Sequence, residues 1–185
     1  MTASSPFDFD PSLMTVEQYR LLPDREDVIQ ELHLGMLVTL AHPKMSHVKI
    51  RSRLRGLLQP FAEGLGVLTT EVAFRALPEY DLRAADVAFV SQDRWDSTSG
   101  EDNLRGSPEL VIEVLSPSNT HREIQEKAAL CLSTGTEEFW AVDPKRNTVT
   151  ITRLDSSSHV YRTGDRIPLA MFGAAQIEVA AIFRQ

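Results

Sequence analysis

The 185-residue sequence lacks the segments that direct a chain into or across a membrane. Residues 1–11 contain Ser, Asp and Pro but no basic stretch and no apolar core, so they do not resemble a secretory signal. No uninterrupted apolar run approaches the length of a membrane-spanning helix. We therefore expect a soluble, cytoplasmic protein that does not associate with membranes.

Cysteine and positive charge are also scarce. The single cysteine, Cys131, excludes an intrachain disulfide, and its place in a predicted helix favours a packed thiol over a nucleophile. The formal net charge of −7 argues against a nucleic-acid partner, because phosphate backbones favour a basic surface. A local patch can still oppose the charge of the whole surface, so a nucleic-acid partner is not excluded.

Hydrophobic residues make up 42% of the sequence, which is enough for one domain with a sizeable core. The chain is too short to suggest two domains, so we expect a single domain over residues 1–185. Residues 1–12 are expected to form a flexible tail. Residues 91–107 are rich in Ser, Asp, Gly and Asn, with Trp95 and Leu104 as their only large apolar residues, a composition typical of a loop.

Hydrophobic periodicity predicts a fold of mixed α and β class. Thr15 and Gln18 have the capping-box spacing, and Leu34-Gly35 separates two strand-like runs as a tight turn does. The predicted elements, in chain order, are a helix at 16–22, a β-hairpin at 28–40, a helix at 46–61, strands at 67–75, 85–90 and 109–115, a helix at 120–134, a strand at 139–142, and an edge hairpin formed by 148–154 and 159–161. The passage from strand to helix to strand across 109–142 predicts a parallel pair with a right-handed crossover.

One carboxylate lies inside the apolar strand at 109–115. Alternation puts Glu113 on the same face as Val111 and Leu115, among side chains that would ordinarily be buried. Removing a lone carboxylate from water costs several kcal/mol unless a cation, a metal ion or hydrogen bonds compensate. We therefore expect a partner for Glu113.

Asp86 and Lys127 are candidates for the same site. Asp86 begins the apolar run of the preceding strand, and Lys127 stands at the margin of the next helix's apolar stripe, from which its ammonium can reach the strand ends. Carboxylates on neighbouring strands supply the hard oxygen ligands that Mg²⁺ accepts, and a lysine could steady an attacking hydroxide or a developing phosphate charge. Spacing alone also allows structural roles. Asp86 could cap a strand, Glu113 could pair with a buried cation, and Lys127 could pair with Glu123 on its own helix.

Four stretches of the sequence together resemble a large bacterial family of predicted endonucleases. They are 82–90 (LRAADVAFV), 108–118 (PELVIEVLSPS), 126–128 (EKA) and 138–144 (EFWAVDP), within a resemblance that covers residues 15–154. The family belongs to the restriction-endonuclease-like PD-(D/E)XK superfamily. The resemblance implies an α/β core with a central mixed β-sheet flanked by helices, hydrolysis of phosphodiester bonds with Mg²⁺ or Mn²⁺, and frequent dimerisation, hence a homodimer.

The resemblance also assigns roles to three residues. Asp86 matches the first aspartate of the superfamily signature, and Glu113 matches the second acid, so both are implied as metal ligands and catalytic residues. Ala85 replaces the proline that usually precedes the aspartate. Leu115 stands where the superfamily's lysine usually stands, and Lys127 matches a position on the following helix to which the lysine has migrated in this branch.

Three further residues are accessory candidates. Glu31 and His47 match recurring positions of the family, and either could instead be structural: Glu31 as the partner of a cation, His47 as a hydrogen-bonded packing residue. Glu71 lies on the predicted polar face of the strand at 67–75, opposite Leu68, Val72 and Phe74. Solvent exposure explains Glu71 adequately, and an accessory role as a metal ligand remains open.

The helix at 46–61 carries a cluster of positive charge near its start. Five basic residues and no acidic ones lie between His42 and Gly56: Lys44, Lys49, Arg51, Arg53 and Arg55. Such a face could approach the phosphates of a nucleic acid, or it could be an ordinary solvated helix surface.

Two functional hypotheses follow from the sequence. The first is a metal-dependent endonuclease that hydrolyses DNA at Asp86, Glu113 and Lys127. The second is a catalytically inactive module of the same fold that binds nucleic acid or a protein partner; the acidic balance and Leu115 favour it.

Overall fold

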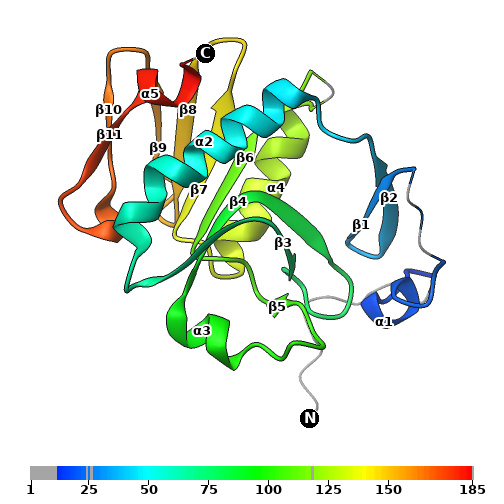
Figure 1. Ribbon diagram of the computed structural model, residues 1–185. Coiled ribbons are helices and arrows are strands. Elements are labelled where there is room, and N and C mark those ends of the chain that lie inside the picture. The colour runs from blue at the N-terminus through cyan, green and yellow to red at the C-terminus, as the bar shows by residue number, and fades with distance from the viewer. Residues whose placement is uncertain (1–11, 24, 26, 118, 185) are drawn as a thin grey trace.

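A seven-stranded mixed β-sheet forms the centre of the computed structural model, which describes residues 12–23, 25, 27–117 and 119–184 (Figure 1). The strand order is β5-β3-β4-β6-β7-β8-β9. The strands are β3 (Gly66–Arg75), β4 (Arg83–Ser91), β5 (Leu104–Arg105), β6 (Leu110–Val114), β7 (Glu138–Asp143), β8 (Thr148–Arg153) and β9 (Ser158–Arg162). β6 and β7 are parallel and are connected through α4 (His121–Ser133), as predicted. The sheet confirms the expected fold class, whereas the expected tail lies outside the described residues except for Ser12.

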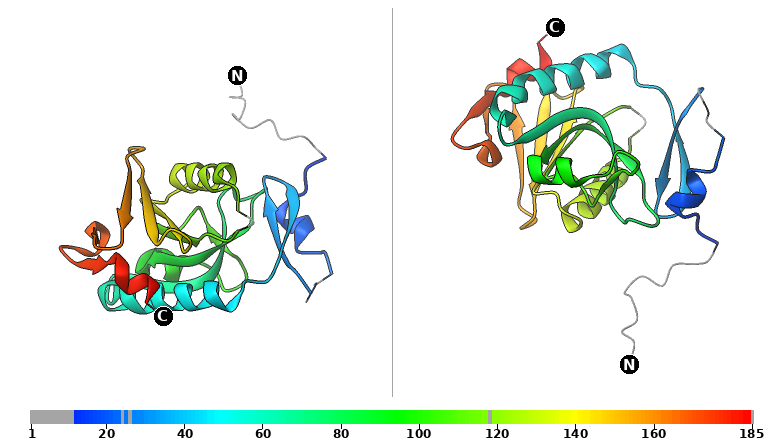
Figure 2. Two further views of the ribbon diagram at one scale, coloured as in Figure 1. Left: turned by 90° about the horizontal axis from the view of Figure 1, so that it is seen from above. Right: turned by 60° about the horizontal axis from the view of Figure 1, so that its bottom comes forward.

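Helices cover both faces of this sheet (Figure 2, left). α2 (Met45–Ala62) packs on one face, where Leu54 and Leu58 join a core cluster with Trp140 of β7. α4 packs on the other face, where Ala128 and Cys131 belong to a second cluster. Burial on both faces explains why β4, β6 and β7 are almost continuously apolar. Cys131 is the packed thiol that was expected, and its burial raises the pKa of the thiol to about 11.

The C-terminal segment packs on the same face of the sheet as α2. β10 (Arg166–Pro168) and β11 (Gln176–Glu178) pair as a small antiparallel sheet, with the 3₁₀ helix η1 (Ala170–Phe172) between them. β11 leads into α5 (Val179–Phe183), which packs beside α2 in the same core cluster. Among the described residues, none of the helices combines the length and apolar character needed to cross a bilayer.

The predicted N-terminal hairpin forms a separate two-stranded sheet of β1 (Ile29–His33) and β2 (Met36–Leu40). Leu34 and Gly35 have φ angles of 50° and 81°, as the two central residues of a tight hairpin turn require. Leu32 exchanges backbone hydrogen bonds of 2.9 and 2.8 Å with Leu82, which attaches the hairpin to the start of β4. The hairpin is therefore fixed beside the sheet although it is not one of its strands.

A short helix packs behind the hairpin. α1 (Val16–Tyr19) begins with the predicted capping box, in which Thr15 and Gln18 exchange side-chain to backbone hydrogen bonds. Val16 is fully buried against Leu32. The helix ends at Tyr19 rather than at the predicted Leu22.

The loop predicted for residues 91–107 is wrong in part. Gln92–Ser97 forms the helix α3, and Leu104–Arg105 forms the edge strand β5. The Arg94 guanidinium donates to the carbonyl oxygens of Ser107 and Arg105, both at 3.0 Å, and Leu104 is buried. Arg75 also donates to Asp102 of this segment at 3.1 Å. Hydrogen bonds of charged side chains thus hold the segment, and hydrophobic periodicity does not detect such contacts.

The regular alternation predicted for the strand at 67–75 is also wrong. Leu68 of β3 packs beneath α2, whereas Val72 and Phe74 pack beneath α4, on the opposite face of the sheet. The reversal falls at Glu71, which has a φ angle of 57°, a value that non-glycine residues rarely adopt.

The partner strand β4 reverses at the same place. Ala85 packs beneath α4 and Val87 beneath α2, although two residues so spaced would share a face in a regular strand. The β3–β4 register includes the pairs on either side but omits Glu71 opposite Asp86. A local distortion therefore turns both strands over at Asp86, one of the predicted site residues.

Leu58→Ala tests the core beneath α2. The Leu58 side chain is fully buried, so its truncation should lower the free energy of unfolding by about 3 kcal/mol. Leu21→Ala is the matched control, because Leu21 is 84% exposed and its truncation should cost less than about 0.5 kcal/mol. Urea unfolding followed by tryptophan fluorescence measures both changes. Equal losses in the two variants would contradict the packing described.

Candidate active site

The candidate site lies where β4 and β6 diverge. Their antiparallel pairing ends at Val87 and Ile112, so the next backbone groups of β6 have no partner on β4. The N–H of Val114 instead donates to Asp86 Oδ2 at 2.8 Å, and the Val114 carbonyl accepts from His47 Nε2 at 2.8 Å. Side chains thus provide hydrogen-bond partners for the backbone N–H and carbonyl of Val114, which β4 does not pair. Buried backbone groups require such partners.

Lys127 is the partner of Glu113. Its Nζ lies 2.8 Å from Glu113 Oε1, and the two side chains are only 12% and 14% exposed. Burial raises the pKa of Glu113 to about 7, against the opposing charge of Lys127, and the nearby Asp86 adds to the rise. Burial alone would lower the pKa of Lys127, but the Glu113 and Glu31 carboxylates together outweigh burial and raise that pKa, so the lysine stays charged. Glu123, the alternative partner, instead accepts hydrogen bonds from Thr120 at the start of α4.

His47 lies against Asp86 at the N-terminal end of α2. Its Nε2 is 3.1 Å from Asp86 Oδ2, and this hydrogen bond raises the pKa of His47, against the opposing effect of burial. The other ring nitrogen, Nδ1, is buried and has no hydrogen-bond partner among the described residues. His47 therefore joins α2 to both diverging strands.

Glu31 places the hairpin at the same site. Its Oε1 accepts from the Ala84 N–H at 3.0 Å, and its Oε2 lies 2.6 Å from His33 Nε2. Burial raises the pKa of Glu31, but the hydrogen bond from His33 and the charge of Lys127 outweigh it and hold that pKa below its ordinary value. The sequence analysis did not identify His33 as a candidate, although its two-residue spacing from Glu31 places both on one face of the strand.

Glu71 and Arg51 form the outer part of the site. Arg51 Nη1 lies 2.8 Å from Glu71 Oε1 and 3.7 Å from Asp86 Oδ1. The Arg51 side chain is 11% exposed, whereas that of Glu71 is 56% exposed. Glu71 therefore contacts the site through Arg51.

The remaining basic residues of α2 do not converge on the site. Arg53 donates to the Ile182 carbonyl of α5 at 3.2 Å, and Arg55 donates to the Leu68 carbonyl of β3 at 3.4 Å. Lys44 and Lys49 are exposed. The basic cluster seen in the sequence is thus divided among three environments.

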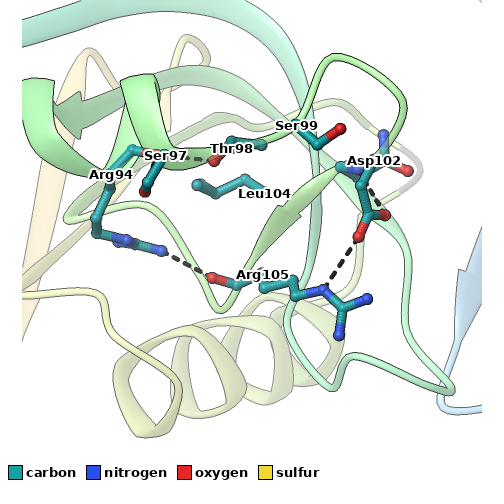
Figure 3. Close-up of a pocket in the computed structure, with 8 residues that line it drawn as sticks. Arg94, Ser97, Thr98, Ser99, Asp102, Leu104 and Arg105 are labelled. Atoms are coloured by element: carbon teal, nitrogen blue, oxygen red, sulfur yellow. Dashed lines mark hydrogen bonds and ion pairs between the residues drawn. The ribbon is translucent and has the colours of Figure 1, made fainter.

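A cavity of about 320 Å³ lies apart from these carboxylates, between α3 and β5 (Figure 3). Its charged groups are already paired: Arg94 donates to the Arg105 carbonyl at 3.0 Å, and Arg105 donates to Asp102 at 3.0 Å. Within the described residues, no three His, Cys, Asp or Glu side chains are grouped so that they could hold a metal ion. Any metal at the fork, as we call the place where β4 and β6 diverge beyond Val87 and Ile112, would therefore have few protein ligands.

The mixed sheet, with two acids and a lysine where its central strands diverge, defines a restriction-endonuclease-like protein. The sequence matches the model of the Uma2 family, described as "Putative restriction endonuclease", over residues 16–180, and the chain belongs to this family. A crystal structure from Anabaena variabilis, described as a "putative nuclease belonging to DUF820", is similar with a TM-score of 0.78 and 18% identity, over 92% of this chain and 97% of that chain. At this identity the likeness shows a shared fold. Comparison with curated proteins yields no match.

Lys127→Met tests the buried ion pair. In a chelating buffer at pH 8 it should lower the free energy of unfolding by about 3–5 kcal/mol, because the buried Glu113 carboxyl loses its cation and must then carry an uncompensated charge or take up a proton at a pH far above its ordinary pKa. A carboxyl group whose pKa is higher in the folded than in the unfolded protein lowers the free energy of unfolding at pH values above the folded pKa. This loss disappears as the pH falls to the pKa of the unfolded protein. The deficit should therefore shrink at pH 5.5. Urea unfolding at both pH values measures it.

Two variants control this experiment. Lys145→Met removes an exposed lysine and should have little effect at either pH. Adding Glu113→Gln to Lys127→Met should restore much of the lost stability, because the uncompensated charge is then absent. A deficit that is the same at both pH values, or that the second substitution does not reduce, would contradict the pairing.

Proposed function

We propose that this protein is an endonuclease that hydrolyses phosphodiester bonds of DNA with Mg²⁺ or Mn²⁺. The observation that carries the proposal is the grouping of Asp86, Glu113 and Lys127 at the fork between β4 and β6. Membership of the Uma2 family supports a nuclease and a nucleic-acid substrate.

The donor atoms at the fork suit a hard divalent cation. Asp86 and Glu113 offer carboxylate oxygens, and a bound cation would favour the ionised form of Glu113, whose pKa burial raises. Mg²⁺ commonly binds one or two carboxylates and keeps several waters, so a larger protein ligand set is not needed. A cation bound there would polarise a phosphoryl oxygen and lower the pKa of a bound water.

The surrounding residues hold this arrangement in place. Lys127 neutralises Glu113 and can direct an N–H toward the attacking oxygen or the phosphate charge. Glu31 and Lys127 bind the N–H and the carbonyl of Ala84, which fixes β4 beside the acids. His47 donates to Asp86 and to the Val114 carbonyl, so it orients the first acid. We assign supporting roles to Glu31 and His47.

DNA would approach the edge of the site at the start of α2. Lys44 and Lys49, at and near that end of the helix, are exposed and could contact phosphates of the DNA backbone. The homodimer implied by the family resemblance stays a prediction.

The second candidate is an inactive nuclease-fold module that binds nucleic acid or a protein. Leu115 at the usual lysine position favours it, as does the small number of metal-binding side chains among the described residues. Calorimetric titration with Mn²⁺ separates the two candidates. An isotherm that Asp86→Ala abolishes supports the nuclease, and the absence of any isotherm supports the module.

Plasmid cleavage in Mg²⁺ or Mn²⁺ tests the active site directly. Asp86→Ala, Glu113→Ala and Lys127→Ala should each lower the cleavage rate by about 100-fold or more, since each removes a charge needed in the transition state. Glu126→Ala is the control, because Glu126 lies beside Lys127 in sequence but is exposed and pairs with Arg122. Cleavage that is unchanged in Glu113→Ala and Lys127→Ala would show that the site lies elsewhere.

A further inference from the structure

Arg51 is a buried cation to which the proposed reaction assigns no role. It approaches the fork from α2, on the face of the sheet opposite to α4, which carries Lys127 (Figure 2, left). The two carboxylates thus have one cation on each face: Lys127 beside Glu113, and Arg51 beside Asp86.

The guanidinium of Arg51 is only partly used by the protein. Nη1 makes both of its contacts, at 2.8 Å to Glu71 and at 3.7 Å to Asp86. Across the described ranges, Nε and Nη2 have no hydrogen-bond acceptor. An arginine keeps its charge at any relevant pH, and its guanidinium presents N–H donors in one plane, in a geometry that matches phosphate oxygens.

The charge of the site favours such a use. Four carboxylates surround the fork, those of Glu31, Glu71, Asp86 and Glu113. Among the described residues, Lys127 and Arg51 are the lysine and the arginine that pair with them, and His33 and His47 contact Glu31 and Asp86. Lys127 is already shared between Glu113 and the Ala84 carbonyl. A phosphodiester is an anion, so a second cation is needed to offset the repulsion from these acids.

We propose that Arg51 binds the scissile phosphate and that Glu71 is the residue that positions it. The inference rests on the proposed function, because it presumes that a phosphodiester enters the fork. Glu71 is then a partner of Arg51 rather than a metal ligand. Glu71 has a left-handed backbone conformation, with a φ angle of 57°, and its carboxylate accepts from the guanidinium at 2.8 Å.

Binding of fluorescein-labelled duplex DNA, measured by anisotropy over a series of salt concentrations, tests the role of Arg51. Ca²⁺ replaces Mg²⁺ in the assay, since it takes the same oxygen ligands. Arg51→Gln should weaken binding about tenfold and lower the slope of log K against log salt by about 0.9, the value for one phosphate contact. Arg51→Lys should keep the slope and recover part of the affinity.

Arg53→Gln is the matched control. It removes the same charge from the same helix, but the Arg53 guanidinium donates to Ile182 on α5, away from the fork. Its affinity should change by less than about twofold, with a slope near the wild-type value. If Arg51→Gln and Arg53→Gln give equal slopes and affinities, the proposal is overturned.

Glu71→Gln keeps the test decisive if Arg51→Gln does not fold, because Glu71 is mostly exposed. The variant removes a negative charge and leaves Arg51 in place, so DNA should bind roughly twofold to threefold more tightly at low salt. Mn²⁺ should bind with unchanged stoichiometry, and its affinity should fall by no more than a similar factor, because only a nearby charge is lost. A loss of Mn²⁺ affinity of about tenfold or more would make Glu71 a metal ligand and overturn its role as the partner of Arg51.

Cleavage assays separate this inference from the proposed function. Binding that depends on Arg51, without cleavage by the wild-type protein in Mg²⁺ or Mn²⁺, defeats the nuclease assignment and supports the phosphate contact. Cleavage by Arg51→Gln with wild-type kcat and KM supports the nuclease assignment and overturns the phosphate contact.

Discussion

The divergence of β4 from β6 is the constraint on which the site depends. Beyond Val87 and Ile112 the two central strands no longer share hydrogen bonds, although helices cover both faces of the sheet. Backbone groups in such a place must find other partners or cost stability. Asp86 and His47 supply those partners for Val114, so residues for which we propose a chemical role also satisfy the fold.

The same requirement explains why distant segments converge on β4. The N–H of Ala84 donates to Glu31 of the hairpin, and its carbonyl accepts from Lys127 of α4. The hairpin is outside the main sheet, yet Glu31 is 7% exposed and lies in the field of Lys127. The buried Glu31 carboxylate attaches the hairpin to β4, so the hairpin borders the site.

The sequence predicted most strands of the central sheet, the helices α2 and α4, and that Asp86, Glu113 and Lys127 could lie together, because these depend on local periodicity and on strongly typed positions. It failed where charged side chains affect the course of the backbone. Arg94 helps to hold a segment of loop-like composition, and the reversal at Glu71 and Asp86 has no trace in the alternation of apolar residues. Arg51 was identified only as part of a basic helix, since its contact with Glu71 joins residues far apart in the chain.

The position of the lysine on a helix has a consequence that a lysine on the strand would not have. Lys127 binds Glu113 of β6 and the Ala84 carbonyl of β4, so a single ammonium connects the two strands across the fork. Ala128 beside it is buried, and the capping box at Thr120 and Glu123 fixes the start of α4, so the lysine stem has little freedom. Asp86 connects the same two strands through the Val114 N–H. A widening of the fork would break both connections at once, because each spans the gap. The separation of the two strands is therefore set by the residues proposed to act on a substrate.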